Sequence, residues 1–155
     1  MTESLTYSES LFINATPGEV YAAVSDVTRM GEWSPVCKAC WWENDGGPSV
    51  GSTFMGRNEA DGRTWETQST VVFADEGERF GFSLNQGRVF WIYSMEPADG
   101  GTTLTESWEL TADGQQFYVD RDGEKAPEVI QGRVDAARSG IHETLAAMKR
   151  VLEQH

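Results

Sequence analysis

The sequence has few cysteines, histidines and basic residues. Two cysteines and two histidines occur among 155 residues, and 12 Lys and Arg stand against 25 Asp and Glu, which gives a formal net charge of -13. Two cysteines are too few for the disulfide framework typical of small secreted domains. A strongly acidic surface repels phosphate backbones and anionic membranes. The composition therefore argues against nucleic acid as a partner.

Long hydrophobic runs are also missing. No apolar stretch approaches the length of a membrane span, and the opening MTESLTYSES does not combine a basic flank with an apolar segment, as a signal peptide does. We expect no membrane insertion and a cytoplasmic location. The length suits a single hydrophobic core, so we expect residues 1–155 to form one domain, as a monomer or weak homodimer.

Two short helices are predicted near the N-terminus. The stretch T-P-G-E at residues 16–19 has the pattern of a capping box, with proline at the position where a helix tolerates it best. Valines follow at helical spacing. Asp26 or Thr28 can cap a second helical turn, which Ser34 and Pro35 end, because the residue before proline avoids the helical conformation.

Most of the remaining chain alternates with a period of two residues, which is typical of strands. Short turns rich in Asp and Gly separate these segments and favour antiparallel neighbours. Strands are predicted at residues 5–14, 36–43, 51–59, 64–73, 79–85, 88–96 and 102–110.

The C-terminal part of the sequence predicts a long helix. Residues 113–126 are polar and are expected to form a loop, and Pro127 opens a helix of about 26 residues, or about 39 Å. Its apolar stripe consists of Ile130, Val134, Ala137, Ile141, Leu145, Met148 and Leu152. We therefore expect an α+β fold, in which a curved seven-stranded antiparallel sheet wraps around this helix.

Several motifs occur in an order that resembles a known superfamily. They are A-T-P-x-E-V-Y-x-x-V-S-D-V-T-x-M-x-x-W-S-P at residues 15–35, G-x-x-F-x-G-x-N at 51–58, W-x-Y at 91–93, G-T-x-L-T-E-S-W at 101–108 and G-I-x-x-T-L-x-x-M-K at 140–149. The chain resembles the SRPBCC or START-related superfamily, in its polyketide cyclase/dehydrase-like branch. The resemblance implies a helix-grip (START-like) fold with a cavity between sheet and helix that holds a hydrophobic molecule. It implies no particular catalytic residue.

Strand alternation selects the side chains that would line such a cavity. Large aromatic residues and a few polar ones share one face, as in small-molecule sites. The alternative is that the aromatic residues simply fill a core. The candidate ligand-binding residues are Trp65, Trp91, Tyr93, Trp108, Phe54, Asn58, Ser69, Phe82, Glu106, Arg133 and Ile141.

Glu106 is the most informative of these candidates. A carboxylate is rarely buried without a partner, and Arg133 on the long helix is a candidate partner. A register shifted by one residue would instead place Glu106 in water. Glu106 and Tyr93 are weak candidates for an acid/base role.

Cys37 and Cys40 form a C-x-x-C sequence on a predicted strand. A redox pair of the thioredoxin type needs a helix N-terminus, and zinc needs further ligands, of which the sequence offers only His142 and His155 as histidines. We therefore expect core thiols, no metal and no cofactor. His142 lies one step off the apolar stripe and is expected to be exposed.

Three functional hypotheses remain open. The first is binding of a small hydrophobic ligand, polyketide-, lipid- or aromatic-like, without chemistry. The second is a polyketide aromatase/cyclase or dehydratase that uses cavity shape and a buried acid. The third is a protein-interaction or regulatory module, for which an exposed apolar patch would be the sign.

Overall fold

The computed structural model of the protein describes residues 2–154 and contains every strand that the sequence predicts. Strand ends differ from the expected ones by no more than two residues. The strands are β1 (Leu5–Ile13), β2 (Cys37–Trp42), β3 (Thr53–Ala60), β4 (Arg63–Asp75), β5 (Arg79–Leu84), β6 (Val89–Ala98) and β7 (Gly101–Leu110).

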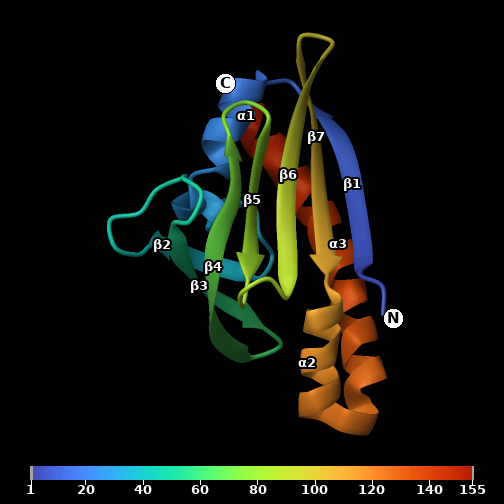
Figure 1. Cartoon of the computed structure of the whole chain (residues 1–155). Coiled ribbons are helices and arrows are strands. Elements are labelled where there is room, and N and C mark those ends of the chain that lie inside the picture. Colours follow the sequence, from blue (N-terminus) through green and yellow to red (C-terminus); the bar gives the residue numbers. More distant parts are fainter. Residues whose placement is uncertain (1, 155) are drawn as a thin grey trace.

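The strands form one antiparallel sheet in the order β1-β7-β6-β5-β4-β3-β2. Consecutive strands from β2 to β7 are neighbours, whereas β1 closes the other edge against β7. A long helix, α3 (Ala126–Leu152), crosses behind the sheet in Figure 1. This arrangement is the helix-grip α+β fold expected from the order of the elements.

The two short N-terminal helices begin as the sequence predicts. Thr16 caps α1 (Pro17–Val24) in a capping box: its hydroxyl oxygen accepts from the Glu19 amide, and its own backbone amide donates to the Glu19 carboxylate. Of the two candidate caps for the next turn, Asp26 is the one used, because its carboxylate accepts from the Thr28 amide at the start of the 3-10 helix η1 (Val27–Glu32).

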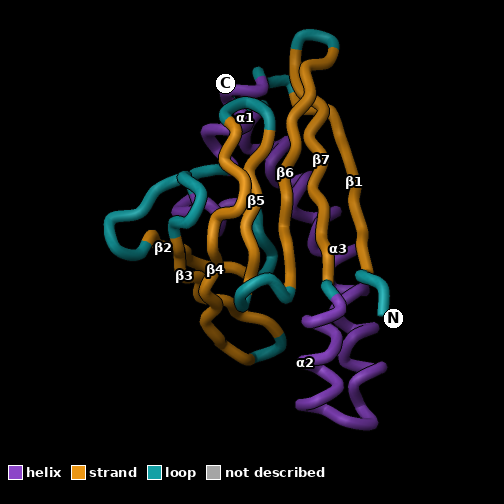
Figure 2. The backbone as a smooth tube through the Cα atoms, in the orientation of Figure 1, coloured by secondary structure: helices purple, strands orange, loops and turns teal. Residues whose placement is uncertain are grey.

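The expected loop at residues 113–126 is wrong. The structure has an α-helix there, α2 (Ala112–Asp122), and a 3-10 turn, η2 (Gly123–Lys125), which leads into α3. Thr111 supplies the N-cap by accepting from the Gly114 amide. The prediction failed because α2 has no continuous apolar stripe. Figure 2 shows α2 and the first turns of α3 extending together beyond the sheet.

Gly114 explains how α2 approaches the sheet. A Cβ atom at this position would lie 2.5 Å from the backbone oxygen of Arg88 and 2.6 Å from a methyl carbon of Leu110. The first turn of α2 therefore packs directly on the ends of β6 and β7, and only glycine leaves room for that contact.

The core lies between the sheet and the apolar stripe of α3. Ile141, Leu145 and Met148 are fully buried, as are Ile13 and Leu104 on the facing strands. Within residues 2–154, no helix is both long enough and apolar enough to cross a membrane.

The stripe of α3 should carry a large share of the stability. We expect Leu145→Ala to lower the free energy of unfolding by about 2 to 5 kcal/mol, because it removes a fully buried side chain and leaves a cavity. Chemical denaturation of wild type and variant measures the loss. Glu143→Ala, at an exposed position on the same helix, is the control and should change stability by no more than about 0.5 kcal/mol. A Leu145→Ala loss within that surface range would contradict the packing.

Candidate functional site

The predicted lining residues on the strands come from one face of the sheet, and Arg133 and Ile141 come from α3. Trp91 lies opposite Trp108 on one side and opposite Phe82 on the other, and Tyr93 lies opposite Glu106. Phe54 is paired with Ser69 across β3 and β4. The register that the alternation predicts is therefore correct, and Glu106 faces the interior and not the solvent.

Most of these side chains are deeply buried. Phe54, Phe82, Tyr93, Trp108, Asn58, Ser69, Glu106 and Ile141 all belong to the buried set, whereas Trp65 and Trp91 are partly exposed. Some of these side chains contact one another or a neighbouring residue. The Phe54 and Phe82 rings pack edge to face with centroids 5.1 Å apart. The Asn58 side-chain amide donates to the Thr67 hydroxyl oxygen.

Glu106 and Tyr93 form a buried polar pair among these aromatic residues. The Tyr93 hydroxyl donates a hydrogen bond of 3.0 Å to Glu106 Oε2. Only 3% of Glu106 is exposed, and its second oxygen, Oε1, has no hydrogen-bond partner among the described residues. An unpartnered buried carboxyl oxygen is costly, so it is a natural point for contact with a bound molecule.

Burial changes the protonation of this pair. The pKa of Glu106 is raised to about 8, mainly by desolvation. The hydrogen bond from Tyr93 opposes this shift, and the nearby charge of Glu9 contributes to it. Desolvation also raises the pKa of Tyr93 well above 10, and the adjacent carboxyl adds to that shift. At neutral pH Glu106 is therefore mainly a neutral acid, able to donate as well as accept.

Arg133 does not pair with Glu106. It is exposed on α3, where its guanidinium lies 5.8 Å from the centre of the Tyr118 ring of α2. The prediction failed because it took 113–126 as a loop. The helix that replaces the loop supplies an aromatic surface for Arg133.

Glu9 is a residue of the site that the sequence analysis missed. It lies directly opposite Glu106 on β1, and its Oε1 is 2.8 Å from Nδ1 of His142. The Tyr7 hydroxyl donates to its other oxygen. Alternation along β1 would have placed Tyr7 and Glu9 on the inward face. The His142 side chain is 73% exposed, as expected, although it contacts Glu9.

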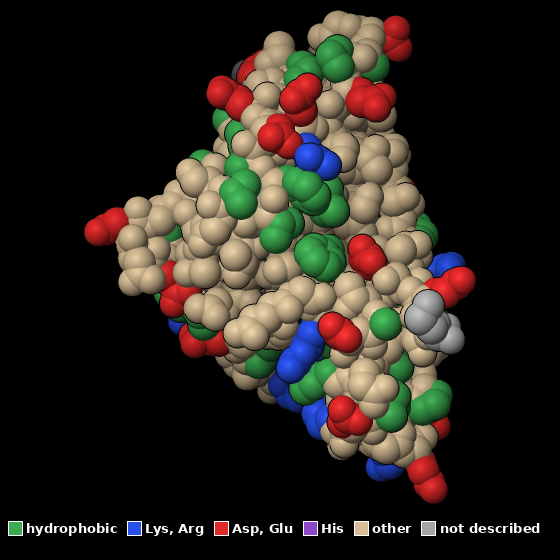
Figure 3. Space-filling model, viewed as in Figure 1, with side chains coloured by type: hydrophobic (Ala, Val, Ile, Leu, Met, Phe, Trp, Pro, Cys, Tyr) green, Lys and Arg blue, Asp and Glu red, His purple; other side chains and the backbone are tan. Residues whose placement is uncertain are grey.

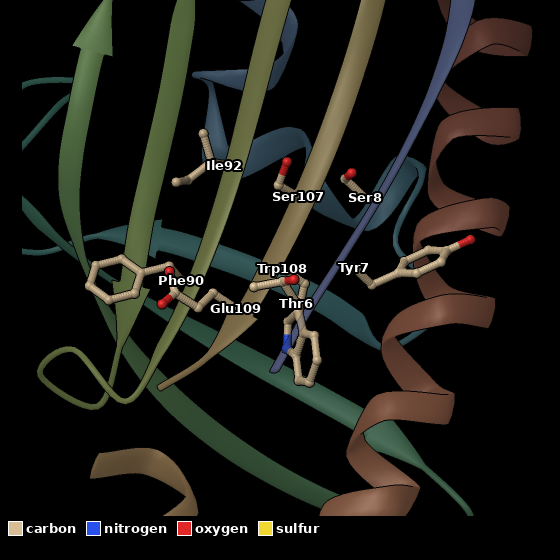
Figure 4. Close-up of a pocket in the computed structure, with 8 residues that line it drawn as sticks. All are labelled: Thr6, Tyr7, Ser8, Phe90, Ile92, Ser107, Trp108 and Glu109. Atoms are coloured by element: carbon tan, nitrogen blue, oxygen red, sulfur yellow. The ribbon is translucent and has the colours of Figure 1, made fainter. Parts of the chain in front are cut away.

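Neither of two hollows on the surface is the expected interior cavity. A groove of about 240 Å³ lies over β1, β7 and β6 at one edge of the sheet. In this groove Ser8, Ser107 and Ile92 lie in a row across the three adjacent strands (Figure 4). Tyr7 points instead toward α3. A second hollow, of about 550 Å³, lies between α2 and the β5–β6 turn. The interior cavity stays a prediction.

The outer surface bears on the interaction hypothesis. Figure 3 shows hydrophobic side chains gathered over the middle of the outer sheet face, with acidic and basic groups around them. The large apolar residues that are most exposed, however, come from four separate elements or loops: Phe12, Trp41, Val50 and Val119.

Cys37 and Cys40 lie in contact, which the sequence did not indicate. Their sulfur atoms are 3.0 Å apart, and both residues are buried free cysteines. They occupy the space next to Gly56, where a Cβ atom would lie 3.3 Å from Cys40 Sγ. The thiols thus fill the room that the missing side chain of Gly56 leaves. Among residues 2–154 no group of three or more His, Cys, Asp or Glu is placed to hold a metal.

Fold and site together define a helix-grip protein with a buried acid on its inner face. The family described as polyketide cyclase/dehydrase and lipid transport matches residues 4–153. The chain belongs to this family, which is part of the SRPBCC superfamily.

Solved structures agree with this assignment. A Polyketide_cyc-like protein from Corynebacterium glutamicum is 54% identical, with 99% of this chain and 94% of that chain covered and a TM-score of 0.75. The di-domain ARO/CYC StfQ from the steffimycin biosynthetic pathway is 14% identical, with 98% and 51% covered and a TM-score of 0.76. Ara h 8.0201 is 17% identical, with 98% and 99% covered and a TM-score of 0.67. The last two show the fold alone. A search among curated proteins found no match.

The buried carboxyl predicts a specific pH dependence of stability. The pKa of Glu106 is about 8 in the folded protein, against an ordinary value of 4.5 for an unfolded chain. The folded state therefore holds a proton that the unfolded state releases, so this stabilisation is complete below about pH 4.5 and is lost as the pH rises through 8. We expect a loss of the order of 4 kcal/mol over this range.

Glu106→Gln should remove that component of the pH dependence. The measurement is the free energy of unfolding in urea at pH 5, 6, 7 and 8, as the difference between wild type and variant. Glu109→Gln, on the outward face of the same strand, is the matched control and should retain the slope of the wild type. Parallel curves for wild type and Glu106→Gln would contradict a buried neutral acid at residue 106.

Proposed function

We propose that this protein binds a small hydrophobic molecule of polyketide-, lipid- or aromatic-like chemistry between the sheet and α3. Family membership supports binding of this class. The observation that carries the proposal is Glu106, a buried acid with one oxygen held by Tyr93 and the other unpartnered. No described residue makes a hydrogen bond with that second oxygen, so a polar group of a ligand would be its partner.

The protonation state of Glu106 determines which ligands suit the site. A neutral carboxyl donates to a carbonyl or hydroxyl oxygen, whereas a carboxylate only accepts. Because burial keeps Glu106 protonated at neutral pH, the site favours a mainly apolar molecule with a carbonyl oxygen placed near Oε1. The partly exposed Trp65 and Trp91 lie at the border of the buried group and would cover the ligand's apolar surface.

A matched pair of probes tests this proposal. We expect 2-acetylnaphthalene to bind the wild type more tightly than 2-ethylnaphthalene at pH 6.5, by about two- to tenfold, because only the ketone accepts the hydrogen bond. Glu106→Leu should abolish the preference and retain binding of the hydrocarbon. Calorimetry or a shift in Tm measures both affinities.

The pH adds a second arm to this experiment. Above about pH 8 the wild type should lose its preference for the ketone, because the ionised carboxyl can no longer donate. The hydrocarbon affinity should hardly change. Equal affinities for the two probes in the wild type would remove Glu106 from the proposed site, and failure of both probes to raise the Tm would contradict interior binding.

A second candidate function is that of a polyketide aromatase/cyclase or dehydratase at the same place. It is favoured by the pKa of Glu106, about 8, because an acid/base group works best near the pH of the reaction. In this role Glu106 would move the proton and Tyr93 would hold the carboxyl in position. The shape of the interior would orient the polyketide substrate for ring closure.

Turnover of a short poly-β-ketone thioester tests the enzyme hypothesis. We expect the wild type to accelerate loss of water and formation of an aromatic product. Ultraviolet absorbance and mass spectrometry measure both. Glu106→Gln should lower the rate by about 10²- to 10⁴-fold, the contribution of one general acid/base group. Unchanged rates in wild type, variant and protein-free buffer, with binding of the thioester intact, would leave binding alone.

A further inference from the structure

A β-bulge turns both cysteines of the C-x-x-C sequence to the same face. In a regular strand, residues three positions apart point to opposite faces. In β2 the register shifts between Cys37 and Ala39, so that Cys37 pairs with Asn58 and Cys40 pairs with Gly56. Asn58 and Gly56 are two residues apart and share the inward face of β3. The extra residue therefore brings the two thiols together, as bulges do when they redirect a side chain.

The two sulfur atoms are already in contact. Their separation of 3.0 Å is about 1 Å longer than a disulfide bond, so a small movement would close them. Both cysteines are more than nine-tenths buried, and the thioether of Met30 lies 3.8 Å from Cys40 Sγ. The absent side chain of Gly56 leaves the space that the pair fills.

We propose that Cys37 and Cys40 form a reversible disulfide site that reacts with hydrogen peroxide or small organic peroxides. The proposal is independent of the proposed function, because it needs no ligand and no part of Glu106. The absence of a helix N-terminus argued against a thioredoxin-type pair in the sequence. In a regular strand the C-x-x-C spacing would keep the two thiols apart, whereas the bulge in β2 brings them together.

The chemistry has two balanced steps. The Cys37 thiolate attacks one peroxide oxygen, the O–O bond breaks, and a sulfenic acid and hydroxide form. Cys40 then attacks the Cys37 sulfur, the S–O bond breaks, and water leaves. In sum, two thiols and one hydrogen peroxide give one disulfide and two waters. Two equivalents of a small thiol, or one dithiol, restore the two cysteines by successive exchange steps and leave as their own disulfide.

The roles of the two sulfurs follow from their hydrogen bond. Either sulfur can donate in this hydrogen bond, and the arrangement with Cys40 as donor is the one that favours a Cys37 thiolate. The hydrogen bond lowers the pKa of Cys37, while the same hydrogen bond and burial raise the pKa of Cys40. The thiolate is the nucleophile in these reactions, so Cys37 is the attacking residue and Cys40 resolves the sulfenic acid.

Intact mass of the folded protein after treatment with a few equivalents of hydrogen peroxide tests the proposal. These are the only two cysteines of the chain, so a disulfide within one molecule identifies the pair. We expect the mass to fall by two hydrogen atoms without covalent dimers, and dithiothreitol to restore the starting mass. Near-ultraviolet circular dichroism checks that the protein stays folded.

Single variants separate the two roles. Cys40→Ser should lose the disulfide and instead add oxygen at Cys37 or form covalent dimers, while Cys37→Ser should react much more slowly. If a serine variant fails to fold, the alanine variant at the same position replaces it. Oxygen addition in place of a disulfide in the folded wild type would overturn the proposal. So would a native protein that stays reduced while the urea-unfolded chain is oxidised under the same conditions.

Discussion

The packing of α3 against the curved sheet is the constraint on which the other features depend. One sheet face can bury its side chains only if another element covers it. Here the stripe around Ile141, Leu145 and Met148 provides that cover, mainly against β1 and β7. Without the helix, the inward face of β1 and β7 would stand in water. The same contact also creates the low-dielectric surroundings in which Glu106 sits.

The chemistry of the site follows from this burial. A carboxyl with 3% exposure cannot keep its charge without a cation, and Arg133 turns away toward Tyr118. Tyr93 supplies one hydrogen bond, which is too little to offset desolvation, so the acid stays protonated. Glu9 works in the same direction from the neighbouring strand. The site therefore presents a neutral donor in an apolar setting.

The sequence predicted the strands and the inward face well, because alternation and turn residues are local signals that the sheet respects. Trp91, Tyr93, Glu106 and Trp108 lie where their alternation places them. Three other features could not be predicted from the sequence, for physical reasons. Helix α2 begins with a polar cap and has only Gly114 buried, so no apolar period marked it. The bulge in β2 depends on pairing with β3, and the fate of Arg133 depends on α2.

The choice between ligand binding and catalysis turns on one proton. A protein that only binds its ligand needs the Glu106 proton to stay on the carboxyl, where the proton makes the same hydrogen bond for as long as the complex exists. An enzyme needs that proton to move to the substrate as charge develops in the transition state. The pKa near 8 permits either, because it keeps the proton at neutral pH without holding it tightly. What separates the two is whether a reacting atom of the bound molecule comes within hydrogen-bond reach of Oε1, since proton transfer requires that geometry before any matching of pKa values.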